Sequence, residues 1–430
     1  MRFLPLLFLS LFLTACSTTS PLPRPVEGLR PRNVIFLIGD GMGISQVTLA
    51  RLAEGGPSYQ LMLDRMPVTG LVRTHALNAW VTDSAASATA LACGEKTNLF
   101  AVGMGPEDQL LDSLLVGAQK KGQSVGLVTS TRLTHATPGA FAAHVKLRWM
   151  EQPIARHYLE AGVDVLLGGG KRNFPENLLE DYREAGYSVV ESKSDLANSK
   201  GKVLGLFARS HMPFIVDRGD EPTLPDMAKK ALEVLSKDPQ GFFLMMEGGR
   251  IDHACHMNDA PAMVRELIEF DQVVKMAVDF AQKNGETLVV VTADHSTGGL
   301  AVTEKAMSLR HRFEEMTASA SRIESLWKPG EGAALLKKYA KIESVSAEEL
   351  KRIDEAKNAK ERVLWIGRLI SRECGVTFIP MPTRLTKPNS TNGHVGGMVP
   401  VYSFGPGAEN LSGTMENAEL SRRIRMLAGY

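Results

Sequence analysis

Apolar runs alternate with amphipathic stretches along most of the chain from residue 33 onward. Such runs are typical of buried parallel strands, and the stretches between them are typical of the crossover helices of βαβ units. The pattern predicts an α/β fold: a central, mostly parallel β-sheet flanked by helices on both faces. The predicted strands are 34–38, 70–73, 125–129, 163–167, 242–246, 287–292 and 400–404.

A short helix is predicted from Ala85 to Cys93, because these residues are small or good helix formers and Gly94 suits a helix C-terminus. Asp83 and Ser84 come just before it, so a hydroxyl lies at the helix N-terminus. Free N–H groups and partial positive charge make that position favourable for an anion such as phosphate. Taken alone, either residue is more often a simple N-cap, so both interpretations stay open.

The first residues are typical of a secretory signal peptide: Arg2, an apolar run over 3–13, and then Thr14, Ala15 and Cys16. The run is too short to span a bilayer as a mature helix. Residues 13–16 resemble the lipobox of bacterial lipoproteins, which implies cleavage before Cys16 and a lipid on that cysteine. The alternative is a plain signal peptide with an incidental cysteine.

This pattern divides the chain into a signal peptide (1–15), a lipidated, Ser-, Thr- and Pro-rich tether (16–32) and one main domain (33–430). The expected location is therefore the bacterial cell envelope, with the exported protein held at a membrane through the lipid on Cys16. If the source has two membranes, that membrane is the outer one or one facing the periplasm.

A formal net charge of +1 argues against nucleic acid as a partner, because no basic excess is present to neutralise a phosphate backbone. The other cysteines are Cys93, Cys255 and Cys374, which lack CxxC spacing. Neither a disulfide framework nor a cysteine zinc site is therefore predicted, and free, buried thiols are expected.

Polar residues follow several of the predicted strands directly. In open α/β sheets, ligands bind beyond the carboxyl ends of the strands. The polar chemistry is therefore expected at one edge of the sheet. The residues concerned are Asp40 after the first strand, 130–135 after the third, Glu247 after the fifth, and Asp294 with His295 after the sixth.

Three further features add possible metal ligands. Asp252 and His256 are four residues apart, so a helix would place both on one face, within reach of one cation. His135 and Thr137 are separated by one residue, so an extended backbone would point both the same way. His394 lies among glycines just before the last strand.

Each of these residues has a structural alternative when taken singly, as a turn aspartate, a surface acid–histidine pair or a structural histidine. Together they suit zinc, which accepts mixed Asp and His ligands, with a harder, oxygen-rich site left for magnesium. Arg148 presents a planar fork suited to two phosphate oxygens, although alone it would be taken as a solvated helix residue.

Read in this order, these stretches resemble the alkaline phosphatase family of two-zinc, one-magnesium phosphomonoesterases. The resemblance runs from residue 33 to about 300 and resumes at 392, and its most specific part is the run 83–87, Asp-Ser-Ala-Ala-Ser. It implies hydrolysis of phosphate monoesters through a phosphoserine on Ser84, with Arg148 holding the phosphate. It implies one zinc on Asp252, His256 and His394, a second on Asp40, Asp294 and His295, and magnesium on Asp40, Thr137 and Glu247.

Two positions vary within that family, and here they are His135 and His253. The resemblance places His135 at the magnesium site, which then has one carboxylate fewer than in members with aspartate there. Activation by added magnesium and an alkaline pH optimum are therefore expected. Family members are commonly homodimers, so a homodimer is an expectation of the same origin.

Residues 301–390 are predicted to form a helical insert near the active site, with helical patterns at 304–326, 332–339 and 347–374. Their charge runs are most simply solvated helix faces. A role in substrate choice or dimer contact is the weaker interpretation.

Two other functions are considered. A phosphodiesterase or sulfatase on the same scaffold is disfavoured by the surroundings of Ser84 and by Arg148. A non-catalytic metal- or phosphate-binding lipoprotein is disfavoured because every ligand position is filled. No histidine lies beside Ser84 in the sequence, so metal coordination is the remaining way to activate its hydroxyl.

Overall fold

The computed structural model describes residues 30–304, 310–379 and 392–430. The signal peptide, Cys16 and most of the predicted tether lie outside these residues. Within the described part of the chain, we find no helix with the length and apolar character needed to cross a bilayer.

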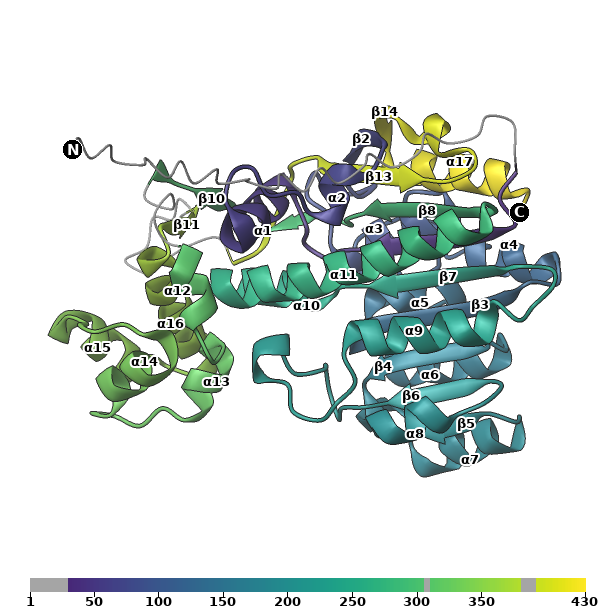
Figure 1. Cartoon of the computed structure of the whole chain (residues 1–430). Helices are drawn as coiled ribbons and strands as arrows, with labels where there is room; N and C mark the ends of the chain where they lie inside the picture. The colour runs from purple at the N-terminus through teal and green to yellow at the C-terminus, as the bar shows by residue number, and fades with distance from the viewer. Residues whose placement is uncertain (1–29, 305–309, 380–391) are drawn as a thin grey trace, which may run out of the picture.

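One ten-stranded sheet forms the centre of the molecule (Figure 1). Its strands, in order across the sheet, are β14 (Gly413–Glu416), β2 (Val68–Arg73), β13 (Val399–Phe404), β8 (Thr287–Thr292), β1 (Asn33–Ile38), β7 (Phe242–Glu247), β3 (Ser124–Arg132), β4 (Val165–Gly169), β6 (Val203–Leu206) and β5 (Ser188–Val190). Neighbouring strands are parallel except β13, which is antiparallel to both β2 and β8. The predicted α/β fold with a mostly parallel sheet is confirmed.

Helices cover both faces of this sheet, with α9 and α11 in front in Figure 1 and α3 to α6 behind. Those of the main body are α1 (Ile44–Gly55), α2 (Met62–Arg65), α3 (Ser84–Cys93), α4 (Leu114–Lys120), α5 (Ala136–Ala142), α6 (Glu151–Glu160), α7 (Glu176–Glu184), α8 (Lys193–Asn198), α9 (Leu224–Leu235), α10 (Arg250–His256), α11 (Ala260–Asn284) and α17 (Asn417–Ala428), with 3-10 turns at Lys171–Asn173, Ile215–Asp217 and Ala408–Leu411.

Every residue of the central strands β1, β7 and β8 is buried. Because these strands are covered on both faces, they are apolar at nearly every position rather than at alternate ones. Aromatic packing ties sheet to helix: the ring of Phe141 on α5 lies 6.1 Å from that of Phe36 and 5.8 Å from that of Phe243. This layer fixes the relative positions of the strand ends that carry the polar residues.

In the central sheet, one predicted strand is displaced and three strands were not predicted. The strand expected at 163–167 is β4, which begins at Val165 and runs through two glycines. A Cβ on Gly169 would lie 2.2 Å from the carbonyl oxygen of Ser210, so only glycine fits this close approach. The unpredicted strands β5, β6 and β14 have three or four residues, too few for a clear pattern.

The insert forms a helical lobe at the left of Figure 1, where α12 packs against α1 and α16 against α11. Its helices are α12 (Arg310–Glu315), α13 (Ala320–Ser325), α14 (Gly332–Ala340), α15 (Ala347–Asp354) and α16 (Ala359–Glu373). Two small antiparallel pairs join it to the body: β10 (Leu300–Val302) with β11 (Val376–Phe378), and β9 (Ser296–Thr297) with β12 (His394–Val395).

The patterns at 304–326 and 347–374 each contain two helices rather than one. Ser319 caps α13 by accepting a hydrogen bond from the N–H of Arg322 at 3.1 Å, and Asn358 caps α16 in the same way from Glu361 at 3.0 Å. These caps start new helices inside stretches that look continuous by charge and hydrophobicity. Residues 305–309 and 380–391 lie outside the described residues.

The cysteines behave as expected. Cys93, Cys255 and Cys374 form no disulfide among the described residues, and the last two are fully buried. Burial raises the pKa of the Cys93 thiol to about 12, so it stays protonated at neutral pH.

Candidate active site

The carboxyl ends of β1, β7 and β8 meet at one edge of the sheet, because these three strands are neighbours and parallel. Glu247 is the last residue of β7, Asp40 lies two residues after β1, and Asp294 lies two residues after β8. Gly41 has a φ of 73°, and a Cβ there would lie 2.8 Å from the Cα of Asp252. The glycine therefore lets the loop after β1 approach α10 closely.

Ser84 is the first residue of α3 and is 2% exposed. The N-cap is Asp83, whose Oδ1 accepts a hydrogen bond from the N–H of Ala86 at 3.1 Å. Of the two roles considered for this pair, Asp83 takes that of N-cap. The hydroxyl of Ser84 does not cap the helix and is left for other contacts. Its Oγ lies 3.1 Å from Nε2 of His295, a residue 211 positions away in the sequence.

Arg148 lies beside this helix N-terminus rather than on a solvated helix. It occupies the turn between α5 and α6, and its side chain is 20% exposed. Nη1 donates to Oδ2 of Asp83 at 2.9 Å, and Nη2 lies 3.0 Å from Nε2 of His135. The guanidinium is thus held next to Ser84, as a phosphate-binding residue would require.

Phe100 belongs to this arrangement and was missed in the sequence. Its φ of 74° is rare for a bulky side chain. Its N–H donates to Oδ1 of Asp83 at 3.2 Å, and its carbonyl accepts from the N–H of Arg148 at 2.9 Å. Phe100 therefore connects the helix cap to the arginine, and strain of this kind is concentrated at functional sites. A run of ordinary residues carries no signal for such a backbone conformation.

Three groups of side chains place ligand atoms within 4.8 Å of one another, in the described part of the chain. The first contains Asp252, His295 and His394, the second Asp40, Asp294 and His295, and the third Asp40, His135 and Glu247. The groups contain all the metal ligands named in the sequence except His256 and Thr137. Asp40 and His295 each belong to two groups, and His135 belongs to the third.

His256 joins the first group through contacts of its own. Its Nε2 lies 3.1 Å from Oδ2 of Asp252 and 3.3 Å from Nε2 of His394. Both histidines are oriented by backbone carbonyls: Nδ1 of His394 lies 2.9 Å from the oxygen of Thr82, and Nδ1 of His256 contacts the oxygen of Asn392. Such contacts turn the other ring nitrogen toward a metal.

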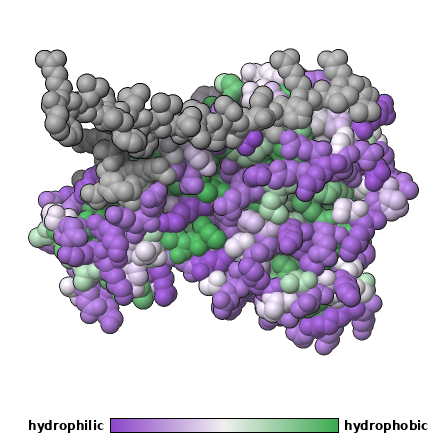
Figure 2. All heavy atoms as spheres, in the orientation of Figure 1, coloured by the Kyte–Doolittle hydropathy of each residue, from purple (hydrophilic) through white to green (hydrophobic). Residues whose placement is uncertain are grey.

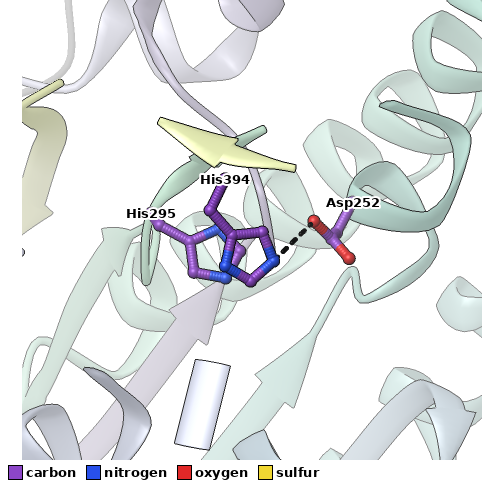
Figure 3. A group of neighbouring side chains, drawn as sticks. All are labelled: Asp252, His295 and His394. Carbon is purple, nitrogen blue, oxygen red and sulfur yellow. Dashed lines mark ion pairs between the residues drawn. The ribbon is translucent and has the colours of Figure 1, made fainter. Parts of the chain in front are cut away.

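Figure 3 shows how the rings of His295 and His394 stack beside Asp252, with centroids 3.6 Å apart and planes 20° apart. The dashed line marks the approach of Nε2 of His394 to Oδ1 of Asp252 at 3.8 Å. Thr297 donates to the same oxygen at 2.6 Å. Asp252 is therefore fixed by neighbours on the strand side, and its other oxygen faces His256.

Several buried polar atoms of these groups and of Thr137 have no hydrogen-bond partner among the described residues. Burying a polar or charged atom without a partner is costly, so each such atom indicates a missing interaction. The donor set is carboxylate, imidazole and hydroxyl, which suits zinc and magnesium. The residues therefore fit bound cations. The atoms are both carboxylate oxygens of Asp40, Oε1 of Glu247, Oδ2 of Asp294, Nδ1 of His135 and Oγ1 of Thr137.

The acidities of the carboxyl groups give the same result. Burial, together with the charges of Asp294 and other carboxylates, raises the pKa of Asp40 well above its usual value. Burial and the charge of Asp252 raise the pKa of Asp294 to about 8, and burial raises that of Glu247 to about 7. Metal cations would supply the positive charge that these groups lack.

Asp252 is the exception among these carboxyl groups. Burial alone would raise its pKa, but the charge and hydrogen bond of His256, with the charge of His394, hold the pKa well below its usual value. In the first group alone, therefore, side chains of the protein neutralise part of the carboxylate charge.

The expected geometry of His135 and Thr137 was wrong. His135 is the N-cap of α5 and Thr137 is the second residue of that helix, so strand alternation does not place them. The β3 strand ends at Arg132, and the turn that follows leads directly into the helix. His135 still reaches Asp40 and Glu247, with which it forms the third group.

A histidine that sequence reasoning missed lies next to this third group. The ring of His211 lies 5.5 Å from that of His135 and 4.3 Å from that of His253, and it contacts the guanidinium of Arg132. Burial, with nearby cationic groups, holds the pKa of all three imidazoles below the usual value. An isolated histidine in a loop gives no signal of this kind in the sequence.

A serine at a helix N-terminus, an arginine fork beside it, and carboxylate–imidazole groups at parallel strand ends define a metal-dependent hydrolase with a nucleophilic serine. Comparison with known proteins gives the family. Residues 31–430 match the family described as alkaline phosphatase. The chain is 37% identical to alkaline phosphatase 3 of Bacillus subtilis over 417 residues, covering 91% of this chain and 88% of that protein. It is 35% identical to alkaline phosphatase 4 of the same organism, with the same coverage.

Solved structures agree. A cold-active alkaline phosphatase from Shewanella sp. superposes with a TM-score of 0.83 at 29% identity, covering 92% of this chain and 99% of that one. The Thermus thermophilus alkaline phosphatase gives a TM-score of 0.84 at 26% identity, covering 98% and 96%. The chain belongs to the alkaline phosphatase family, and it is a zinc- and magnesium-dependent hydrolase of phosphate monoesters. The resemblance seen in the sequence is confirmed.

Proposed function

We propose that Ser84 is the nucleophile of this phosphatase and that a phosphoserine on Ser84 is its covalent intermediate. The observation that supports the proposal most is the position of the Ser84 hydroxyl: it lies at the N-terminus of α3, 3.1 Å from Nε2 of His295, a member of two of the candidate metal groups. A capping role does not account for the hydroxyl, because Asp83 already caps the helix.

In this proposal, Asp252, His256 and His394 hold one zinc ion, and Asp40, Asp294 and His295 hold the second. Asp40, Thr137 and Glu247 hold magnesium, with His135 beside them. When bound, the metal ions supply the positive charge that lowers the pKa of the serine hydroxyl and stabilises the attacking and leaving oxygens. The unpartnered oxygens of Asp40, Asp294 and Glu247 support these assignments.

The chain itself supplies binding and orientation. Arg148, held by Asp83 and His135, presents its fork to two non-bridging phosphate oxygens. The free N–H groups and partial charge at the start of α3 act on the same phosphoryl group. Ser84 attacks phosphorus and the alcohol leaves; water then cleaves the phosphoserine, which releases phosphate and regenerates the serine.

The experiment that tests the proposed function is hydrolysis of phenyl phosphate, compared with its diester and sulfate analogues, at alkaline pH with zinc and magnesium and again after chelation. We expect strong turnover of the monoester that chelation abolishes. A preference for the diester or the sulfate would overturn the proposed substrate class and leave the metal sites in place. Absence of turnover with every metal would favour a binding protein.

Export and anchoring rest on residues 1–16. We propose that the chain is exported, cleaved before Cys16 and held in the cell envelope by lipid on that cysteine. Cys16→Ala should release the protein from the membrane fraction into the soluble exported fraction. Unchanged membrane association of the variant would contradict the anchor.

The limits of the domains and the oligomeric state are further proposals. The body is assigned to 33–430 with the insert at 301–390, and a homodimer is expected from the family resemblance. Sedimentation of the purified protein over a range of concentrations tests the dimer, and a mass that stays monomeric would contradict it.

A further inference from the structure

A cavity of about 600 Å³ opens in the insert, away from the metal groups. Its walls come from α15, α16, β11 and the segment that follows β10. This volume is in the range of pockets that bind small molecules. Since none of the residues assigned to catalysis or metal binding contributes to the walls, the cavity is a feature separate from the active site. We call it the insert cavity.

The walls of the insert cavity combine apolar and basic side chains. Trp365, Leu369 and Phe378 form part of its apolar surface, and Phe378 is almost fully buried on β11. Three arginines and two glutamates also line it, so the lining carries more positive than negative charge. The charged residues are Arg352, Arg368, Arg372, Glu304 and Glu349.

The three arginines differ in their partners. Arg372 contacts the carboxylate of Glu349 and lies 3.2 Å from that of Glu373, and Arg352 contacts that of Glu348. Arg368 makes no ion pair with a described residue. Its Nη1 is buried and has no hydrogen-bond partner, and its guanidinium lies 5.3 Å from the centre of the Trp365 ring.

Among the arginines of this cavity, Arg368 alone has neither a carboxylate partner in the described part of the chain nor an acceptor for its buried Nη1. Burial lowers the pKa of Arg368, and no carboxylate acts in the opposite direction. The group stays protonated at physiological pH, so an acceptor with negative charge would complete its interactions. The planar fork suits the two oxygens of a carboxylate or a phosphate group.

We propose that the insert cavity binds a small organic anion, with its oxyanion group on Arg368 and its flat apolar part against Trp365 and Phe378. The oxyanion group is a carboxylate or a phosphate. The site is independent of hydrolysis at Ser84, so its test does not depend on turnover.

The probes are benzoate and phenylphosphonate, added to the holoenzyme, with binding followed by tryptophan fluorescence and by calorimetry. Phenylphosphonate also resembles substrate, and its binding at Ser84 is measured separately as competitive inhibition. The difference between the wild-type protein and Trp365→Phe isolates the signal of the insert cavity. Saturation by benzoate alone would identify a carboxylate site, and saturation by phenylphosphonate alone a phosphate site.

Arg368→Gln should weaken binding by roughly 10-fold or more, because it removes a charge-assisted hydrogen bond. Lys360→Gln is the matched control: it removes the same charge from the same helix at an exposed position outside the cavity, and it should leave binding unchanged. Thermal denaturation checks folding, and Arg368→Lys, which keeps the charge but not the fork, gives a second, weaker binder if Arg368→Gln is unstable.

Two results would overturn the proposal. The first is the absence of a saturable signal from Trp365 with either probe. The second is equal binding by the wild-type protein and the Arg368 variants. Inorganic phosphate that binds as tightly as phenylphosphonate would refute the apolar part of the site.

Discussion

Charged side chains occur in two very different settings in this molecule. At the strand ends, Asp40, Glu247 and Asp294 are fully buried, and each has a carboxylate oxygen without a hydrogen-bond partner among the described residues. The basic group nearest to Asp40 and Asp294 is the imidazole of His295, whose Nε2 lies 3.6 Å from Oδ1 of Asp40 and 3.2 Å from Oδ2 of Asp294. In the insert, charged side chains lie at the surface in pairs, as in Lys337 and Glu343, whose side chains are 63% and 74% exposed at a separation of 2.7 Å. Figure 2 shows hydrophilic residues over most of the insert helices at the left.

The two settings distinguish charged groups of the proposed active site from charged groups that are simply solvated. The fold can pair a buried charge where it needs to, since Arg218 and Glu269 form an ion pair at 2.6 Å with side chains only 2% and 5% exposed. The carboxylates at the strand ends therefore lack an arginine or lysine partner even though the fold provides one for a buried carboxylate elsewhere. In the proposed assignment, metal ions are the partners that these carboxylates lack.

The largest effect is expected from Ser84→Ala. Because Asp83 keeps the cap of α3, the variant should fold and retain its metals, whereas hydrolysis of phenyl phosphate should fall by roughly 1000-fold or more, as for loss of a nucleophile. Ser87→Ala is the matched control in the same helix. Its hydroxyl donates to the carbonyl of Asp294 at 2.7 Å, so the variant should lose about 1 kcal/mol of stability and keep most of its activity. Equal activity losses in the two variants would contradict the assignment.

Removing the metals should make stability depend on pH. The folded pKa values of Asp294 and Glu247, about 8 and about 7, lie above the ordinary values of 3.8 and 4.5. At pH values between the ordinary and the folded pKa of each group, the folded protein binds more protons than the unfolded chain, so stability falls as pH rises. His135 and His253, whose folded pKa values are lowered, act in the opposite direction only up to pH about 6.5.

From pH 7 to 9 the carboxyl groups therefore dominate, and the chelated protein should lose several degrees of Tm while the metal-loaded protein does not. Thermal denaturation with and without chelator measures this. Asp294→Asn should flatten the curve of the chelated protein. A Tm difference between the two forms that stays constant across this range would contradict the account.

Arg148→Ala should reduce kcat/KM by roughly 10- to 1000-fold, because a charged fork at the phosphoryl group is lost. Inhibition by inorganic phosphate should weaken in parallel. Arg148→Lys keeps the charge and loses the two-pronged contact, so its activity should lie between that of the wild-type protein and that of Arg148→Ala. Phosphate inhibition that is unaffected in both variants would remove Arg148 from the phosphate site.

A smaller effect is expected at the third metal group. His135→Asp replaces a nitrogen donor by a carboxylate beside Asp40 and Glu247, and magnesium prefers oxygen ligands. The magnesium concentration for half-maximal activation should therefore fall, which a titration at fixed zinc measures. The wild-type protein should show activation by magnesium and an alkaline optimum. An unchanged titration curve in the variant would place His135 outside the site.

The smallest effect is expected in the insert. Lys337→Ala breaks an exposed ion pair and should change the free energy of unfolding by less than about 1 kcal/mol. Arg218→Ala, which leaves Glu269 buried and unpaired, should cost about 3–5 kcal/mol. Denaturant unfolding of both variants measures the difference. Similar losses would show that the insert pairs are not merely solvated.

The parts of the fold that the sequence predicted are those with a strong local signal. Central strands buried on both faces are continuous apolar runs, and the residues that follow them are collected by the parallel arrangement. Asp40, Glu247 and Asp294 could be placed at one edge for that reason. The limits of β4 and the two-helix form of the insert patterns depend on close glycine packing and on single caps, which periodicity does not show.

The missed features of the site depend on contacts between distant segments. The approach of His295 to Ser84, the backbone of Phe100 and the place of His211 beside His135 each arise only when the chain has folded. The family resemblance supplied the ligand groups that spacing alone left open, and the unpartnered oxygens supply the physical reason for them.

The most direct test of the account is mass spectrometry of the Ser84 peptide after the metal-loaded enzyme has been mixed with phenyl phosphate and quenched rapidly in acid. The account predicts an added phosphoryl group on Ser84, formed and lost on the time scale of turnover and absent after chelation. Turnover without phosphate on this peptide at any time, or phosphate carried by another residue, would contradict it.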